Sequence, residues 1–180
     1  MKSISDIKSL FPIIAGGIEL HIFSKEDITP AYLGWLNDKQ LMRFSNQQYR
    51  SHTLQSCEDY LATFTESDNL FISIIETKTM AAIGTMTAYN YSMHSTSDIG
   101  ILLGANEFSG RGFGSLAWET LVDFLFNEAG IRKVFAGTLT CNVAMINIME
   151  HSGMIEDGRF TDHELVNGSP CDVINYYKIN

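Results

Sequence analysis

Glycines at three alternate positions, Gly110, Gly112 and Gly114, mark the point where an apolar strand pattern changes into an amphipathic helix pattern. Because glycine has no Cβ, such a segment can direct successive backbone N–H groups into one concave surface. A helix expected to begin near Ser115 adds unpaired N–H donors and the positive end of its dipole. Arg111 places a guanidinium beside these donors. The segment therefore predicts a phosphate or pyrophosphate site, with an ordinary glycine-rich turn as the alternative.

Two common phosphate-binding loops have a different residue order. A Walker loop ends in Gly-Lys-Ser/Thr, whereas Ser115 follows Gly114 here with no lysine between them. The dinucleotide-binding fingerprint is GxGxxG near the start of a βαβ unit, whereas this segment lies in mid-chain after several strand patterns. Neither loop type is therefore favoured.

The overall composition restricts the class of protein. The chain has 180 residues, of which 45% are hydrophobic, so one domain spanning residues 1–180 with a substantial core is expected. Its 21 acidic and 12 basic residues give a formal net charge of -9. That balance argues against nucleic-acid binding, because such surfaces cluster Lys and Arg. No apolar run approaches the roughly 18 residues of a membrane span, and no signal peptide is indicated.

The cysteines favour a reducing environment. Cys57, Cys141 and Cys171 are widely spaced and form neither a CxxC pair nor a His/Cys cluster at zinc spacing. This usage predicts a cytoplasmic protein without a metal site.

Hydrophobic periodicity and capping residues predict one continuous series of elements. Strands are expected at residues 18–23, 70–76, 82–91, 97–103, 134–140, 159–166 and 171–178. Helices are expected at about residues 30–37, 54–64, 115–128 and 143–151, the first two capped by Thr29 and Thr53. Asn167 and Gly168 predict a tight turn between the last two strands. The order predicts an α/β domain with helices on both faces of its sheet.

Three segments resemble motifs of the GNAT-type N-acetyltransferases. Residues 109–114, SGRGFG, are similar to the family's central motif Gln/Arg-x-x-Gly-x-Gly/Ala, with Gly112 and Gly114 at the glycine positions and Ser109 in place of Gln or Arg. Residues 97–103, SDIGILL, resemble the family's fourth strand. Residues 142–154, NVAMINIMEHSGM, resemble its Asn-x-x-Ser-x-x-Leu-x-Glu-Lys-x-Gly-Phe helix. The agreements in this helix are Asn142, Glu150 and Gly153, and the departures are Met145, His151 and Met154.

The resemblance implies a fold and a cofactor. The expected GNAT fold has a mixed, mostly antiparallel central sheet whose fourth and fifth strands splay apart, with acetyl-CoA entering the gap. Implied cofactor-binding residues are Ile101, Leu102 and Leu103 through their main chains, the loop Ser109, Gly110, Arg111, Gly112, Phe113, Gly114 and Ser115, and Asn142, which also caps its helix. The implied reaction is direct attack of a primary amine on acetyl-CoA in a ternary complex, with the amides of Leu102 and Leu103 as oxyanion donors.

An attacking amine must lose a proton, because free amines have pKa values of about 8 to 10. Asp98, which opens the fourth strand, is the first candidate for the general base, and Glu76 or a water chain is the alternative. The family often uses a helical Tyr as general acid, but Met149 occupies the matching position. Tyr176 and Tyr177 remain candidates, and the acid stays unassigned.

The acceptor is predicted from a weaker resemblance. Residues 28–61 resemble the corresponding segment of family members associated with amino-sugar and surface-polysaccharide pathways. Arg43, Tyr49 and Arg50 are therefore expected to bind a small amine such as a nucleotide-linked amino sugar between this segment and the terminal hairpin, with His52 as a further contact. The alternative is that the segment is a solvated linker between two helices. His52 and His94 receive no catalytic role. Two alternatives are N-terminal acetylation of a protein, as in the ribosomal-protein branch, and a non-catalytic acyl-CoA-binding module. A homodimer is left open.

Overall fold

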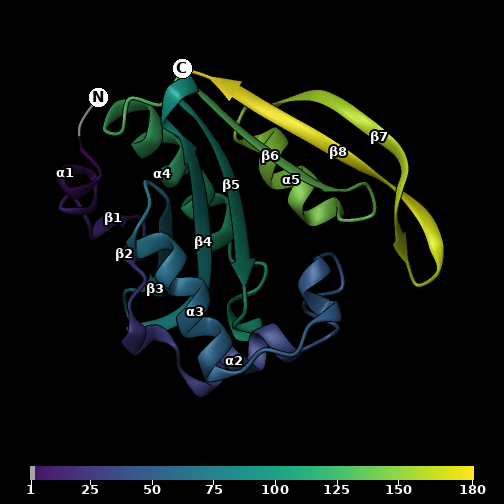
Figure 1. Cartoon of the computed structure of the whole chain (residues 1–180), viewed down its shortest axis with the longest axis horizontal. Coiled ribbons are helices and arrows are strands. Elements are labelled where there is room, and N and C mark those ends of the chain that lie inside the picture. Colours follow the sequence, from purple (N-terminus) through teal and green to yellow (C-terminus); the bar gives the residue numbers. More distant parts are fainter. Residues whose placement is uncertain (1–2) are drawn as a thin grey trace.

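The strands combine into one eight-stranded sheet in the computed structural model, which describes residues 3–180 (Figure 1). Their order across the sheet is β1-β2-β3-β4-β5-β6-β8-β7. The bounds are β1 Ile13–Ala15, β2 Ile18–Ile22, β3 Leu70–Glu76, β4 Ala81–Tyr91, β5 Thr96–Leu103, β6 Lys133–Leu139, β7 Ile155–Val166 and β8 Ser169–Ile179. Every neighbouring pair is antiparallel except β5 and β6, so the mixed, mostly antiparallel sheet predicted above is confirmed.

Helices cover both faces of this sheet. They are α1 Ile4–Lys8, α2 Pro30–Asn37, α3 Leu54–Thr65, α4 Phe113–Asn127 and α5 Val143–His151. Helices α1, α4 and α5 pack into the larger core cluster, whereas α2 and α3 pack into a second cluster on the opposite face (Figure 1). Between Ser3 and Asn180, none of the helices has both the length and the apolar composition that crossing a membrane requires.

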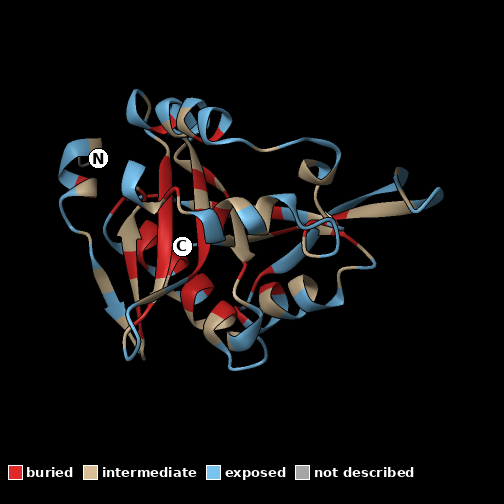
Figure 2. Cartoon of the chain, turned by 90° about the horizontal axis from the view of Figure 1, so that it is seen from below, coloured by how far each residue is buried: buried red, intermediate tan, exposed pale blue. Residues whose placement is uncertain are grey.

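Strand β3 shows how both clusters form from one sequence. Its even-numbered residues Leu70, Ile72 and Ile74 are fully buried in the larger cluster. Phe71 points to the other face, where its ring stacks on Phe23 with centroids 4.1 Å apart. Because successive side chains alternate between faces, a strand covered on both sides reads as a continuous apolar run. Figure 2 shows the resulting buried centre, from which the terminal β7–β8 hairpin projects.

The predicted turn and capping signals are confirmed at residue level. The Thr29 hydroxyl accepts the Tyr32 N–H at 3.2 Å, with Pro30 at the first helical position. Thr53 caps α3 in the same way. Asn167 and Gly168 both have positive φ, at 51° and 80°. Helix α1 and strand β1 were not expected, because each is too short to show a hydrophobic period.

Strands β5 and β6 separate after a short parallel ladder. They pair only from Thr96–Lys133 to Asp98–Phe135, whereas β6 continues to pair with β8 as far as Leu139. These are the fourth and fifth strands of the sequence pattern, renumbered because β1 precedes them. The predicted splay is therefore confirmed, and it leaves the last five residues of β5 with an unpaired edge.

Gly104 fixes the distance between the end of β5 and α2. A Cβ at this position would overlap the indole ring of Trp35. We expect Gly104→Ala to lower the free energy of unfolding by about 1–3 kcal/mol, measured as a lower urea midpoint at an unchanged m-value. The control is Gly34→Ala within α2, where no atom lies within 4 Å of the added Cβ. The free energy of unfolding of Gly34→Ala should instead rise by about 0.5–1 kcal/mol. Equal destabilisation of both variants would contradict the packing argument.

Candidate active site

The loop before α4 presents an uncapped helix N-terminus. Gly110 and Gly112 have φ of 73° and 81°, a left-handed conformation that disfavours side chains. Gly112 is the N-cap, so α4 begins at Phe113, two residues earlier than predicted, and no side chain caps its first N–H groups. Nothing lies within 4 Å of a Cβ built on either glycine. The open space over unpaired donors at a helix dipole suits an anion.

The third glycine of this segment serves packing instead. Gly114 is buried, and a Cβ there would lie 2.8 Å from Leu103 Cδ1 and 3.3 Å from Ile148 Cδ1. Its absence lets α4 approach β5 and α5. Arg111 is exposed, and its guanidinium carbon lies 5.0 Å from the centroid of the Phe108 ring. The remaining predicted loop residues flank these positions, with Ser109 exposed and Phe113 and Ser115 partly buried.

The unpaired edge of β5 faces the gap opened by the splay. The Ser95 carbonyl accepts the N–H groups of Arg132 and Lys133 from the β6 side. Because backbone groups alternate in direction along a strand, those of Ile101 and Leu103 point to the same edge. By the same alternation the Leu102 N–H points toward β4, where Leu102 pairs with Thr85. Of the two predicted amide donors, only that of Leu103 therefore faces the gap.

Asn142 lies across the gap at the start of α5. Its Oδ1 accepts the Met145 N–H at 3.4 Å, and its Nδ2 donates to Thr138 Oγ1 at 3.1 Å. The predicted capping role is confirmed. The side chain is also partly exposed, and it ties α5 to the end of β6.

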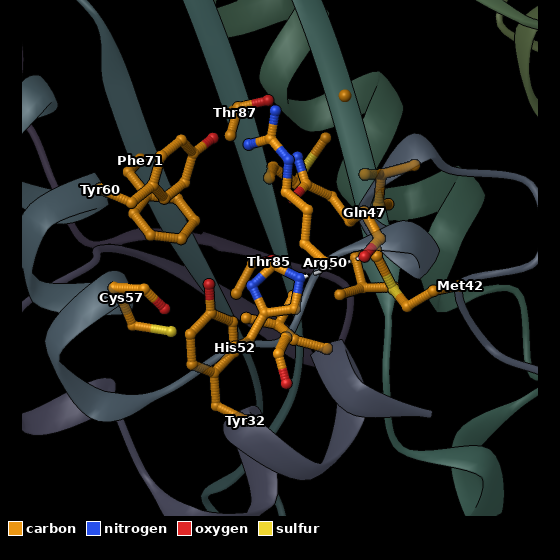
Figure 3. Close-up of a pocket in the computed structure, with 17 residues that line it drawn as sticks. Tyr32, Met42, Gln47, Arg50, His52, Cys57, Tyr60, Phe71, Thr85 and Thr87 are labelled. Atoms are coloured by element: carbon orange, nitrogen blue, oxygen red, sulfur yellow. Dashed lines mark hydrogen bonds between the residues drawn. The ribbon is translucent and has the colours of Figure 1, made fainter. Parts of the chain in front are cut away.

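A central cavity of about 350 Å³ opens on the α2–α3 face of the sheet, beside the same stretch of β5 (Figure 3). Residues from α2, α3, the segment 42–52 and strands β3 to β5 line it. They are Tyr32, Leu36, Met42, Gln47, Arg50, Ser51, His52, Ser56, Cys57, Tyr60, Phe71, Thr85, Met86, Thr87, Gly100, Ile101 and Leu102. A cavity of this volume is in the range of small-molecule sites.

The central cavity contains no carboxylate, although the chain is acidic overall. Arg50 extends along it toward Thr87 (Figure 3). Within residues 3–180 the Arg50 guanidinium forms no hydrogen bond or ion pair. Burial raises the pKa of Tyr32 and of Tyr60 above the ordinary tyrosine value, so both rings stay neutral. Arg50 therefore brings a positive charge to a largely aromatic cavity that contains no carboxylate.

Several of these residues carry no signal in the sequence. Tyr32 and Tyr60 read as the apolar faces of two helices, and Thr85 and Thr87 as ordinary strand residues. His52, expected from the sequence as a further acceptor contact, does line the central cavity. The Asn37 side chain makes two hydrogen bonds to the backbone of His52. Its Nδ2 donates to the His52 carbonyl at 2.9 Å, and its Oδ1 accepts the His52 N–H at 3.0 Å.

Asp98 lines a second opening, the side cleft. This cleft of about 410 Å³ is lined by Phe44, Ser45, Asn46, Asp98, Phe135, Gly137, Thr138, Leu139, Glu164, Val173 and Asn175. Burial raises the pKa of Asp98 to about 6. Asp98 also projects from the same face of β5 as Gly100 and Leu102, which line the central cavity, because residues two apart share a face. A carboxylate with this pKa is ionised but basic at neutral pH.

The prediction that Glu76 is an alternative base is wrong. Glu76, the last residue of β3, is only 5% exposed and lines neither opening. Its carboxylate accepts the N–H groups of Lys78 and Thr79, at 3.1 and 2.9 Å, and the Thr79 hydroxyl at 2.6 Å. The hydroxyl bond, followed by the backbone bonds, lowers its pKa. Glu76 therefore stabilises the turn and is a poor proton acceptor.

Of the three predicted acceptor residues, only Arg50 lines the central cavity. The Arg43 guanidinium donates to the Gln40 carbonyl and stacks 4.4 Å from the Phe44 centroid. Tyr49 is 69% exposed, and its hydroxyl donates to the Leu165 carbonyl of β7 at 3.3 Å. That contact brings residues 43–52 against the terminal hairpin.

Neither tyrosine considered as a general acid lines either opening. Tyr176 is buried and donates to Glu150 Oε1 at 2.8 Å on the α5 side. The Lys133 ammonium lies over the Tyr177 ring, 4.4 Å from the ring centroid. The structure therefore brings neither candidate to an opening, and the acid stays unassigned. Across the described range 3–180, His, Cys, Asp and Glu side chains form no group of three or more suited to a metal ion.

Residues 18–155 match a family model described as an acetyltransferase (GNAT) domain. The chain belongs to the GNAT acetyltransferase family. The match covers the central cavity, the α4 loop and α5, and it ends at the start of the terminal hairpin. Comparison with curated protein sequences gives no match. As a GNAT enzyme the protein is an acetyl-CoA-dependent N-acetyltransferase.

Solved structures share the fold over nearly the whole chain. A spermidine N-acetyltransferase from Vibrio cholerae in complex with CoA and spermine has a TM-score of 0.80 at 16% identity, covering 91% of this chain and 95% of that one. A ribosomal-protein-S5-alanine acetyltransferase from Vibrio fischeri has a TM-score of 0.80 at 19% identity, covering 93% and 96%. RimL, a ribosomal α-N-protein acetyltransferase in complex with coenzyme A, has a TM-score of 0.81 at 16% identity, covering 93% and 97%. The TM-scores establish a common fold. At identities this low they do not identify the acceptor, which has to be inferred from the geometry of the site.

Proposed function

We propose that this GNAT enzyme acetylates a small amine that carries negative charge, namely a nucleotide-linked amino sugar, in the central cavity. The observation that carries the proposal is the unpaired Arg50 guanidinium in a cavity without a carboxylate. Arginine binds phosphate through a planar fork of donors. The rings of Tyr32, Tyr60 and Phe71 supply apolar faces on which a sugar or a base can pack.

The same charge distribution disfavours a polyamine acceptor. A spermidine N-acetyltransferase shares this fold, but a polycation needs carboxylates to offset the cost of removing its charges from water. The central cavity provides Arg50 instead. The ribosomal-protein acetyltransferases share the fold equally well, and a protein N-terminus is the acceptor against which the proposal is tested.

Acetyl-CoA supplies an acetyl group activated as a thioester. We propose that the pyrophosphate is held by the first N–H groups of α4 and by Gly110, Arg111 and Gly112. The main chains of Ile101 and Leu103 then orient the pantetheine arm along the β5 edge, opposite Asn142. This assignment rests on the uncapped helix, the left-handed glycines and the short β5–β6 ladder.

We propose Asp98 as the general base. Its raised pKa leaves it ionised at neutral pH and able to receive the proton of the acceptor ammonium, directly or through water. Its position on the cavity face of β5 supports this role. No residue is assigned as the acid.

Arg50→Ala tests the acceptor. Because the guanidinium is partly screened by solvent, we expect about a tenfold higher acceptor KM with a nucleotide-linked amino sugar, and an acetyl-CoA KM near the parent value. Arg43→Ala is the matched control, since Arg43 lies on the same segment outside both openings.

The readout is thiol release from acetyl-CoA with three acceptors: a nucleotide-linked amino sugar, spermidine and a peptide with a free N-terminus. Release with the sugar and sensitivity to Arg50 support the proposal. Turnover with peptides alone would contradict the proposal, and so would equal acceptor KM values for Arg50→Ala and Arg43→Ala.

A further inference from the structure

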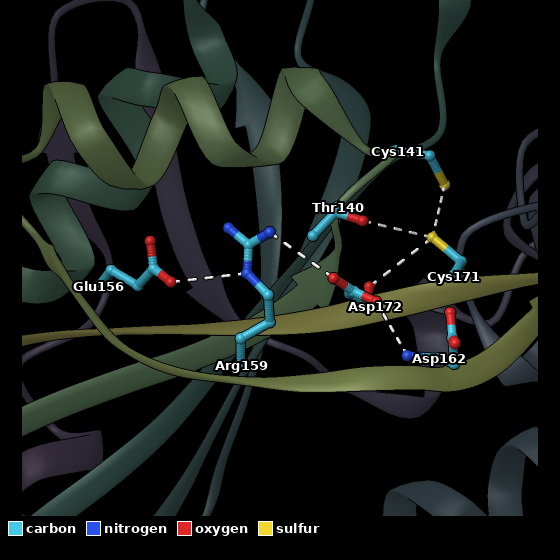
Figure 4. Close-up of polar contacts among 7 residues, drawn as sticks. All are labelled: Thr140, Cys141, Glu156, Arg159, Asp162, Cys171 and Asp172. Carbon is cyan, nitrogen blue, oxygen red and sulfur yellow. Dashed lines mark hydrogen bonds and ion pairs between the residues drawn. The ribbon is translucent and has the colours of Figure 1, made fainter.

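Two thiols face each other beside the active site. Cys141 lies in the turn between β6 and α5, and Cys171 lies in β8 (Figure 4). Their Sγ atoms are 3.6 Å apart, and both cysteines are free. Cys141 is exposed and Cys171 partly exposed, so a small oxidant can reach them.

The backbone holds the two cysteines opposite each other. The β6–β8 ladder pairs Leu139 with Val173, and the Thr140 N–H continues it by donating to the Asp172 carbonyl at 2.9 Å. Extending this register by one residue beyond Thr140 would place Cys141 opposite Cys171, in agreement with the 3.6 Å between their sulfur atoms. Facing residues of antiparallel strands have Cα atoms about 4.5–5.5 Å apart, within the range of about 4.4–6.8 Å found in disulfides. The sulfur atoms can therefore bond through side-chain rotation with little movement of the backbone.

Polar contacts on the other side of β8 fix the strand that carries Cys171. The Asp172 carboxylate accepts the Asp162 N–H at 2.8 Å and lies 3.6 Å from the Arg159 guanidinium, which also pairs with Glu156 (Figure 4). These contacts join β8 to β7. The position of Cys171 is thus set by two neighbouring strands.

The two thiols have different acidities. The Thr140 hydroxyl, 3.5 Å from Cys171 Sγ, is the main cause of a lowered pKa at Cys171. Burial of its sulfur raises the pKa of Cys141. Cys57 is 3% exposed, and burial raises its pKa as well. Since the thiolate is the nucleophile, we expect Cys171 to react before Cys141 and Cys57.

We propose that Cys141 and Cys171 form a reversible disulfide when the enzyme meets a peroxide. The Cys171 thiolate attacks one oxygen of hydrogen peroxide, the O–O bond breaks, and a sulfenic acid and hydroxide form. The Cys141 sulfur then attacks the sulfenic sulfur, the S–O bond breaks, and the sulfur–sulfur bond forms as water leaves. Together the two thiols lose two electrons, and one peroxide becomes two waters. A dithiol reductant reverses the bond by thiol–disulfide exchange.

The test treats the full-length enzyme with hydrogen peroxide and maps its cysteines by mass spectrometry. We expect one cross-linked pair of peptides, carrying Cys141 and Cys171. Its mass should be about 2 Da below the sum of the two reduced peptides, because two thiol hydrogens are lost. Cys57 should stay unmodified. Dithiothreitol should restore both thiols. Because the bond closes a loop of residues 141–171, the Tm should rise by several degrees, a change that oxidation to separate sulfinic acids would not produce.

Single variants separate the two roles. Cys171→Ser should leave Cys141 reduced at the same peroxide dose, whereas Cys141→Ser should stop at a Cys171 sulfenic acid that a dimedone probe traps. Thr140→Val should slow the oxidation several-fold without changing its product. Disulfides between separate chains, or oxidation of Cys141 at the same rate with and without Cys171, would overturn the proposal.

Discussion

Gly112→Asp should abolish acetyl-CoA binding at micromolar concentrations, with affinity falling at least a hundredfold. The substitution places a carboxylate at the N-cap of α4, above donors that no side chain occupies. A pyrophosphate bound there would meet a like charge and would also compete with the new side chain for the same N–H groups. Isothermal titration with acetyl-CoA measures the loss, and circular dichroism shows whether the variant is folded.

Gly112→Asn separates charge from shape. Asparagine has nearly the same volume as aspartate and tolerates the left-handed conformation that Gly112 adopts at φ 81°. Gly112→Asn should therefore weaken acetyl-CoA binding by about tenfold or less. A second pair, Gly130→Asp and Gly130→Asn, repeats the changes at a left-handed glycine beyond the other end of α4. Neither should alter acetyl-CoA binding, and a folded Gly112→Asp that binds as well as the parent would refute the proposed pyrophosphate site.

Local sequence signals were sufficient for most elements. Caps such as Thr29 and Thr53 and the Asn167-Gly168 turn depend on neighbours within a few residues, and each appears as predicted. The start of α4 was misplaced by two residues, because Gly112 itself acts as the N-cap without a capping side chain.

The side chains of the site could not be predicted in the same way. Tyr32 and Tyr60 belong to helices whose apolar faces are clear, but which of their rings reach the central cavity depends on how α2 and α3 pack on β3 and β4. Arg43 and Arg50 look equivalent in sequence, and the turn that begins at Asn46 directs them to different surroundings. Glu76 is the opposite case. A threonine three residues later, at Thr79, already offered a local partner for its carboxylate.

Asp98→Asn should lower kcat at least a hundredfold while making the protein more stable. The amide keeps the shape of the side chain but cannot accept the proton of the acceptor. In the parent enzyme, kcat/KM should fall as pH decreases through about 6, where Asp98 becomes protonated, and this limb should disappear in the variant. Affinity for acetyl-CoA should stay near the parent value.

The stability change follows from the direction of the same pKa shift. Burial raises the folded-state pKa of Asp98 from 3.8 to about 6, so the folded protein binds more protons than the unfolded chain between these values. The contribution of Asp98 to the free energy of unfolding therefore falls as pH rises through this window, and the full cost of the buried charge remains above it. At pH 7 the free energy of unfolding of Asp98→Asn should exceed that of the parent by on the order of 1–3 kcal/mol. At pH 4 little of this difference should remain.

Two comparisons decide the role of Asp98. Asp123→Asn, on the exposed side of α4, makes the same chemical change away from both openings and should alter neither kcat nor stability appreciably. Asp98→Glu keeps a carboxylate on a longer side chain and should retain more activity than the amide. An Asp98→Asn enzyme that is more stable yet turns over at the parent rate from pH 5 to 9 would leave Asp98 a buried carboxylate without a catalytic role. The proton would then pass to water.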